Sequence, residues 1–329
     1  MIFMRLWLAL FGLFCSFLFV SCGKHDNLPI QRLDRQLFAA KSADSVRSML
    51  NQNPTVAQLY FNANGAGNDT ALVRELTNRI GNPALNELYQ QVQAEFGDLA
   101  DLNRQLSEAF VNIKKAFPDF RTPTVATIVT GFELGPDLVI TDSLIVIGLD
   151  YFVGPKAKFR PQGPQYPQYI LRRYQKEYIV PAIVFAISDK YNATNRADQT
   201  ILADMVYYGK GYMFTKTILP QVADSLVIGY SDKQLTETFN AQDIVWAHFI
   251  DNQLIYQTNP AIKGRYLNER PFTAEIGQRC PGAIGRWVGW RIVGRYRDEH
   301  DNVSITDLMR NTDVRQIFEQ SGYKGQKEE

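Results

Sequence analysis

The sequence predicts an α+β fold: a mostly helical single domain with a small antiparallel β-sheet. Two observations indicate this class. Apolar residues recur at spacings of three and four in several long stretches, which is typical of amphipathic helices. The stretch 124–152 is instead rich in β-branched residues and is interrupted by the turn sequence Gly-Pro-Asp, so we interpret it as a hairpin.

Composition divides the chain into four segments. They are a signal peptide over residues 1–21, a short polar tether over 22–28, one continuous domain over 29–323 and a polar tail over 324–329. A length of 329 residues would allow two domains. No internal repeat, low-complexity linker or change of composition marks a boundary within 29–323, so we predict a single domain.

The N-terminal segment has the features of a lipoprotein signal. Arg5 supplies a positive charge, residues 6–20 are apolar, and Ser21 precedes Cys22. This order is typical of a secretory signal, and a cysteine directly after the small residue predicts that Cys22 carries acyl chains such as palmitate. A retained transmembrane helix is the alternative, but it needs about 20 apolar residues. Lipid on Cys22 would hold the protein at a membrane.

Charge and cysteine content limit the classes of function. Removal of residues 1–21 takes away one arginine and no acidic residue, which leaves 34 basic and 34 acidic residues. Nucleic acid is therefore not an expected partner, since its binding requires a positive surface. Once Cys22 carries lipid, Cys280 is the only remaining thiol, so no intramolecular disulfide can form. A hydrophobic core must stabilise the domain instead.

Local patterns place the elements of the first half. A short strand is expected near residues 29–33. The sequence Asn-Pro at 82–83 opens a helix, because asparagine caps helix N-termini and proline fits the first turn. Asp98 is expected to cap the next helix, whose apolar stripe runs over residues 102–117. Pro118 ends that helix.

The middle of the chain contains a loop and then helices. Residues 154–169 hold four prolines among aromatic residues and are expected to form a loop. Helices are expected over most of the remaining chain. One of them, within 200–220, contains Lys210 between two glycines, which allow a bend or the close approach of another element. We expect a packed helix there, and Lys210 is a candidate interaction residue.

A helix is also expected over residues 284–296. Gly285 and Gly289 lie four positions apart and form a smooth strip on one face. A second helix can approach closely along such a strip. We therefore interpret these glycines as a requirement of close packing.

Aromatic and basic residues flank that strip. Trp287 and Trp290 lie on either side of it, and Arg286 begins a ridge of basic and aromatic residues. Three interpretations stay open: a core helix whose arginines reach the solvent, a protein interface with Trp and Arg anchors, and a surface close to a membrane. All three residues are candidate interaction residues.

Residues that could carry catalysis are few. The sequence has no HExxH, GxSxG or P-loop motif. His248 lies in a helical pattern three residues before Asp251, but a lone histidine among apolar residues is more often a hydrogen-bonded core or boundary residue than a zinc ligand. Cys280 has no histidine near it in the sequence and is expected to be a small buried residue. We expect no metal and no cofactor.

Several segments, taken in order, identify a family. The segment CPGAIGRWVGWRIVGRY (280–296) resembles the C-terminal signature of the gliding-motility lipoprotein family GldB. IQRLDRQLFAA (30–40), IVIGLDYFVGP (145–155) and TILADMVYYGKGYMFTKTILP (200–220) resemble its opening, central and Gly-Lys segments, and residues 228–256 resemble the segment that follows. The resemblance covers nearly the whole chain after the signal. It implies an outer-membrane lipoprotein of Bacteroidota that faces the periplasm and is associated with gliding motility and secretion machinery.

That family is also distantly similar to predicted zinc proteases with an HExxH motif. The likeness places the motif on KEYIV, with Lys176 and Val180 in place of the two histidines and Glu177 in the place of the base. Tyr208 stands where those proteins have an acidic third ligand. Zinc binds neutral imidazole or anionic donors, which lysine and valine do not supply. The likeness implies a degenerate zincin-like fold without its metal.

Three functional hypotheses follow, in this order. The first is a non-catalytic accessory lipoprotein of an envelope machinery, whose partners are other envelope proteins and, through its lipid, the membrane. The second is a hydrolase of peptides or cell-wall material that uses Glu177 and His248. The third is a binder of glycans or peptides through the tyrosine- and proline-rich loop 151–174, whose aromatic side chains could stack on a ligand.

Overall fold

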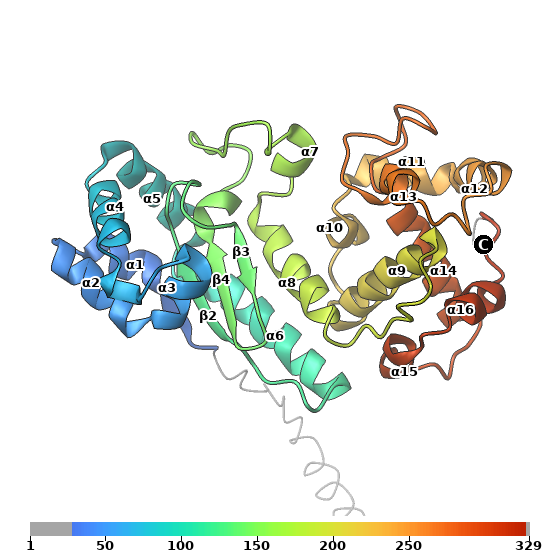
Figure 1. The fold of residues 1–329 in the computed structure, drawn as a ribbon, viewed down its shortest axis with the longest axis horizontal. Coiled ribbons are helices and arrows are strands. Elements are labelled where there is room, and N and C mark those ends of the chain that lie inside the picture. The colour runs from blue at the N-terminus through green and yellow to red at the C-terminus, as the bar shows by residue number, and fades with distance from the viewer. Residues whose placement is uncertain (1–27, 327–329) are drawn as a thin grey trace, which may run out of the picture.

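The computed structural model describes residues 28–326, which Figure 1 shows as a ribbon. Helices form most of this part of the chain and four short strands form one sheet, which confirms the α+β class. The predicted signal peptide and Cys22 lie outside the described residues. The strands are β1 (Ile30–Arg32), β2 (Thr124–Ile128), β3 (Leu138–Ile140) and β4 (Leu144–Gly148).

The helices form two groups, at the two ends of the molecule in Figure 1, with the sheet, α6 (Ala100–Ala116) and α8 (Ile179–Ser188) between them. No helix within residues 28–326 is both long enough and apolar enough to cross a membrane. The first group is α1 (Leu33–Ala39), α2 (Ala43–Gln52), α3 (Pro54–Phe61), α4 (Thr70–Ile80) and α5 (Pro83–Phe96). The later helices are α7 (Gln168–Leu171), α8 (Ile179–Ser188), α9 (Ile201–Ile218), α10 (Asp224–Ile228), α11 (Asp232–Asn240), α12 (Gln242–Asp251), α13 (Pro260–Leu267), α14 (Ile284–Asp298), α15 (Ile305–Arg310) and α16 (Val314–Ser321).

The sheet is mixed, with the strand order β1-β2-β4-β3. β1 and β4 both pair parallel with β2, and only β3 pairs antiparallel, with β4. The predicted antiparallel sheet is therefore wrong, and so is a hairpin between the two halves of 124–152. The hairpin that does form joins β3 to β4 within the second half. The strand expected near 29–33 is confirmed as β1.

Burial on both faces of the sheet explains this error. All residues of β4 are buried, and so is all of β2 after its first residue. Val125 and Ile145 face a core that includes α6 and the later helices, while Ala126 and Val146 face a smaller core beneath α1–α4. Strands covered on both sides have nearly continuous apolar sequences, which is typical of parallel pairing. Content of β-branched residues alone does not give the direction of pairing.

Local patterns placed the first helices well. Pro83 begins α5, and the side chain of Asn82 caps it. The predicted apolar stripe over 102–117 is buried along α6. The predicted cap of α6 is off by one residue: Asp98 accepts a hydrogen bond from the first N–H of the helix, but the N-cap is Leu99.

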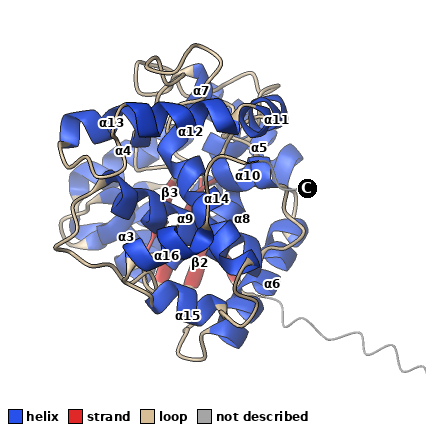
Figure 2. Ribbon diagram, turned by 90° about the vertical axis from the view of Figure 1, so that its right-hand side faces the viewer, coloured by secondary structure: helices blue, strands red, loops and turns tan. Residues whose placement is uncertain are grey.

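Helices α9 and α14 cross at glycines, near the centre of the view in Figure 2. A Cβ on Gly289 would lie 1.8 Å from the carbonyl oxygen of Met205, and a Cβ on Gly209 would lie 2.3 Å from the carbonyl oxygen of Gly289. No side chain fits at these distances, so the predicted close packing of α14 is confirmed. The crossing therefore determines which residues of α9 and α14 lie next to each other, among them Tyr208 and Arg286.

Candidate functional site

A cleft separates the edge of the sheet from the later helices. Its volume is about 380 Å³, within the range of about 300–1,000 Å³ that is usual for ligand sites. β3 and the segment after β4 form one side and α10 the other, and Figure 1 shows α8 between them. Its apolar and aromatic lining consists of Leu138, Phe152, Ile170, Tyr174, Tyr178, Ala182, Phe185, Tyr212, Leu226, Val227 and Ile228.

A glycine ends α10, the helix that forms one side of the cleft. Gly229 follows α10 with φ +78°, a left-handed conformation that favours glycine at a helix C-terminus. A Cβ there would also lie 2.7 Å from Cδ of Arg173. Glycine at this position therefore both ends the helix and makes room for an arginine at the cleft.

Two arginines share one carboxylate in the cleft. Arg173 donates to both oxygens of Glu269, with Nη2–Oε2 2.7 Å and Nη1–Oε1 3.2 Å. Arg286 donates from Nη1 to Oε1 of Glu269 at 3.2 Å and from Nε to the carbonyl oxygen of Leu267 at 2.7 Å. Charged bidentate pairs are stronger and better oriented than neutral hydrogen bonds. This Arg–Glu cluster, Arg173, Glu269 and Arg286, joins segments that lie far apart in the sequence.

Arg286 is further fixed by an aromatic ring. Its Cζ lies 4.2 Å from the ring centroid of Tyr208, close enough for a cation–π interaction. Tyr208 belongs to α9 and Arg286 to α14, so the glycine crossing of the two helices brings this pair together. The arginine is therefore held rigidly at the cleft.

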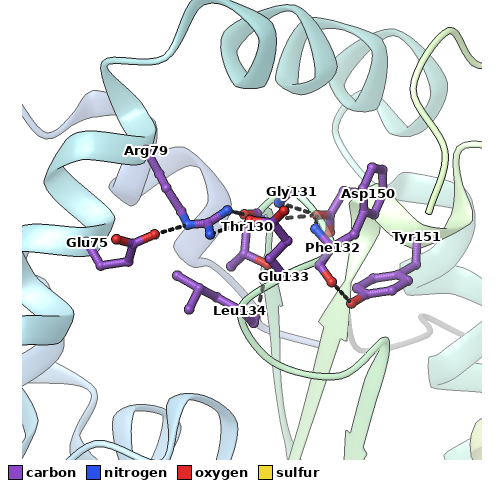
Figure 3. A network of polar contacts seen from close by, with 9 residues as sticks. All are labelled: Glu75, Arg79, Thr130, Gly131, Phe132, Glu133, Leu134, Asp150 and Tyr151. Atoms are coloured by element: carbon purple, nitrogen blue, oxygen red, sulfur yellow. Dashed lines mark hydrogen bonds and ion pairs between the residues drawn. The ribbon is translucent and has the colours of Figure 1, made fainter. Parts of the chain in front are cut away.

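A buried carboxylate holds the loop that leads into β3 (Figure 3). Asp150 is fully buried after β4, and its Oδ2 accepts hydrogen bonds from the N–H groups of Thr130, Gly131 and Phe132 at 3.1, 2.7 and 3.2 Å. Gly131 and Phe132 have positive φ angles of 82° and 70°. Burial raises the pKa of the Asp150 carboxyl, and the backbone hydrogen bonds oppose that shift.

Arg79 of α4 holds the same loop from another direction, as Figure 3 also shows. Its Nη1 donates to the carbonyl oxygen of Thr130 at 3.1 Å and its Nη2 donates to Glu133 at 2.7 Å. The hydroxyl of Tyr151 donates to the carbonyl oxygen of Phe132 at 2.7 Å. Because the loop is anchored by several elements, the start of β3 has a fixed position beside the cleft.

Of the three interpretations of the basic and aromatic ridge on α14, burial of its tryptophans favours the first, a core helix. Trp287 is 1% exposed and Trp290 is 8% exposed, so both tryptophans belong to the core. They are covered because α14 packs against α9, α13 and α16. Of the ridge candidates on this helix, Arg286 is the one that lines the cleft.

Lys210 is also buried, with 2% of its surface exposed. Its Nζ donates to the carbonyl oxygens of Ala193 and Asn311, each at 2.9 Å. Burial lowers the pKa of Lys210 to about 8. In this structure the side chain connects two segments inside the protein and does not present a surface to a partner.

The four protease-like positions have different surroundings. Lys176 pairs with Glu95 at 2.8 Å near the surface, and Glu177 beside it is exposed. Both lie in a short 3₁₀ turn before α8. Val180 is buried within α8, and the ring of Tyr208 lies against the guanidinium group of Arg286. Their role as remnants of a protease site stays a prediction.

His248 and Cys280, the other candidate chemical groups, make contacts within the fold. Nε2 of His248 hydrogen-bonds to the hydroxyl of Tyr266 at 2.9 Å, as expected for a boundary histidine. Cys280 is buried, and burial raises the pKa of its thiol to about 12, which disfavours the nucleophilic thiolate. Among residues 28–326, no three His, Cys, Asp or Glu side chains gather in an arrangement that could hold a metal ion.

Sequence reasoning missed the Arg–Glu cluster and Asp150. The sequence offered a reason to select Asp150 as a candidate site residue, because it is an acidic residue shortly after a strand of apolar residues. Arg173 and Glu269 lie 96 positions apart, and no local pattern relates them. The loop 151–174, singled out as a possible ligand-binding segment, does contribute to the cleft, through Phe152 and Tyr174 among others.

The fold and the site define a helix-rich α+β protein with a mostly apolar cleft beside an edge strand. A family model described as gliding motility protein GldB matches residues 22–325. The chain therefore belongs to the GldB family, as the order of its segments indicated, and is a gliding-motility-related protein whose family indicates a location in the cell envelope. No curated protein and no solved structure matches it.

Proposed function

We propose that this chain is a non-catalytic accessory component of an envelope machinery of the gliding-motility type. It binds protein partners, while lipid on Cys22 anchors it to the outer membrane on the periplasmic side. Membership of the GldB family supports the association with such a machinery, and the family match begins at Cys22, the residue expected to carry the lipid. The domain follows that residue after a short tether, so its partners would be met close to the membrane.

The cleft beside β3 is the observation that carries the binding role. It combines a mostly apolar lining with one fixed cluster of charged groups, a composition that is usual for specific binding sites. At the protease-like positions, Lys176, Val180 and Tyr208 offer neither imidazole nor carboxylate. This set of side chains suits a protein that holds a polypeptide better than one that cleaves it.

Filling the cleft tests this proposal. Ala182 is exposed on α8 and lines the cleft, so Ala182→Trp should occupy it without disturbing the core. Ala247→Trp places the same bulk on an exposed position of α12, away from the cleft, and is the matched control. We expect cross-linked envelope partners to be recovered with wild type and Ala247→Trp, and about tenfold less with Ala182→Trp, which corresponds to a loss of about 1.4 kcal/mol.

Equal recovery with both tryptophan variants would contradict a role of the cleft. Quantitative mass spectrometry of the cross-linked material provides the measurement. Cys22→Ser, which is expected to leave the membrane fraction, separates loss of anchoring from loss of binding. The alternative, a metal-dependent hydrolase, would be favoured by stoichiometric zinc in protein purified without chelator.

A further inference from the structure

We infer that the partner is held through an extended peptide segment, which adds as a fifth strand to the outer edge of β3. The inference rests on the proposed binding function and specifies where the partner binds and in which conformation. The segment belongs to another protein, has little net charge and carries apolar side chains at alternate positions.

β3 directs backbone groups away from the sheet. Backbone hydrogen bonds of 2.8 and 2.9 Å join Asp137 and Thr141 to β4. In an antiparallel pair, the residues whose backbone groups face the partner strand alternate with residues whose groups face outward. Leu138 and Ile140 therefore point their backbone groups to the outer edge, where no further strand lies within residues 28–326.

Ile140 is the residue that an incoming strand would use. The N–H of Leu138 already donates to the side-chain Oδ1 of Asp137 at 2.9 Å. The N–H and C=O of Ile140 form the remaining outward pair. Exposed edges of this kind bind extended peptides through main-chain hydrogen bonds, and neighbouring pockets then select the side chains.

Space for a strand is present at both ends of this edge. The cleft borders Leu138 and, on α8, Ala182. A second hollow of about 480 Å³ borders Ile140 and, on α8, Ala186. β3 and α8 line both hollows, and the path that we infer for the peptide runs along β3 from one hollow to the other. The ten residues of α8 extend about 15 Å, a length that about five residues of extended peptide would span.

The charges along this path favour an uncharged segment. The Arg–Glu cluster lies at the cleft, where Asp137 balances its excess positive charge. At the second hollow, Lys190 pairs with Asp142 at 3.1 Å. A strongly charged ligand would meet repelling as well as attracting groups. An apolar peptide instead gains from burial against Ile140 and the apolar lining of the cleft.

Ile140→Pro tests the strand edge directly. Proline removes the outward N–H of residue 140 and leaves the ladder to β4 in place, because edge strands tolerate proline where the N–H faces outward. Ile140→Ala is the matched control, since it also loses the isoleucine side chain but retains the N–H. Ala182→Trp is a second variant, which blocks the path from α8 and leaves β3 unchanged.

The probe is a peptide selected on the detergent-solubilised full chain from a phage-displayed library of random peptides about nine residues long. The selected peptide is synthesised with a fluorescent label and titrated by fluorescence polarisation. We expect alternating apolar residues in its sequence. Its affinity should be at least about tenfold weaker for Ile140→Pro and Ala182→Trp than for wild type and Ile140→Ala. Selection of no peptide, or equal affinity for the proline and alanine variants, would overturn the inference.

Two further outcomes separate this inference from the proposed function. If envelope partners co-purify with Ile140→Pro as well as with wild type, the protein binds partners but not by strand addition. If the full chain forms a dimer in solution that Ile140→Pro abolishes, a second copy supplies the strand, and the inference of a foreign segment is wrong.

Discussion

Lys210 carries a charge into the core of the C-terminal half. Its ammonium group donates to the carbonyl oxygens of Ala193 and Asn311, from two segments of which one precedes α9 in the sequence and the other follows it. Burial lowers its pKa to about 8, so the folded protein binds this proton less tightly than the unfolded chain does. Lys210 is therefore better explained as a residue that connects these two segments by hydrogen bonds than as a contact for a partner protein.

The depressed pKa predicts a pH dependence of stability. Below about pH 8 both states hold the proton, and the folded state carries the full cost of the buried charge. Between about pH 8 and 10.5 only the unfolded chain holds it, so stability rises with pH in this window. The free energy of unfolding of wild type should increase relative to Lys210→Met by up to about 1.4 kcal/mol per pH unit. A difference that stays constant from pH 7 to 10 in urea titrations would contradict this.

Asp150 provides a second prediction for a single residue. Asp150→Ala leaves one buried and two partly buried N–H groups without their acceptor, so we expect a loss of about 3 kcal/mol in the free energy of unfolding. Asp150→Asn retains an acceptor oxygen and should lose less than half of that. Urea denaturation at pH 7 measures both losses.

The pH dependence of Asp150 checks the same site. Its folded pKa is raised, so the folded state takes up the proton at a higher pH than the unfolded chain does. Wild type should therefore gain stability relative to Asp150→Asn as the pH falls through the raised folded pKa. A stability difference between wild type and Asp150→Asn that stays constant as the pH falls, measured by urea denaturation, would contradict this raised pKa.

Among the elements, the pair α9 and α14 determines the arrangement of the C-terminal half. Their backbones touch at Gly209 and Gly289, and the contact brings Tyr208 beneath Arg286. The sequence predicted a close contact on α14, because Gly285 and Gly289 lie four positions apart and therefore on the same face of the helix. Its partner was not visible, since nothing in 284–296 specifies residues in 201–218.

Alanine substitutions on α14 test the crossing. The Cβ of Gly289→Ala would overlap the carbonyl oxygen of Met205, so the helices must separate, and we expect a loss of more than about 3 kcal/mol in the free energy of unfolding. Gly294→Ala is the control, since its Cβ would lie 3.5 Å from Met213 Cε in ordinary contact. It should be neutral or stabilising by up to about 1 kcal/mol. Similar effects of both substitutions would contradict the close crossing.

Strands were harder to predict than helices for a physical reason. The apolar residues of the helix at 102–117 recur with the helical period, so this segment alone is enough to predict the helix and its buried face. The direction of β2 against β4 depends on burial of both faces of the strands by other parts of the chain. A nearly continuous apolar sequence is typical of such parallel strands, but a high content of β-branched residues alone does not distinguish the two directions. Only the short β3, which is partly buried at the edge, pairs as a hairpin.

Across the whole molecule, the cleft arises from contacts that no local pattern contains. Arg173 follows α7, Glu269 follows α13 and Arg286 lies in α14, and folding brings them to one side of the sheet edge. The sequence analysis singled out the loop 151–174 because its aromatic side chains could stack on a ligand, and residues of this loop do line the cleft. It could not indicate that β3 would be an edge strand, on which the proposed peptide site depends.

In the proposed function, this cleft binds a polypeptide without cleaving it. The most direct measurement is the mass of the selected peptide after prolonged incubation with the full chain in the presence of added zinc. We expect mass spectrometry to recover all of the peptide intact, while fluorescence polarisation shows that the peptide is bound. Fragments that accumulate with wild type but not with Glu177→Gln would contradict the account and establish the hydrolase alternative.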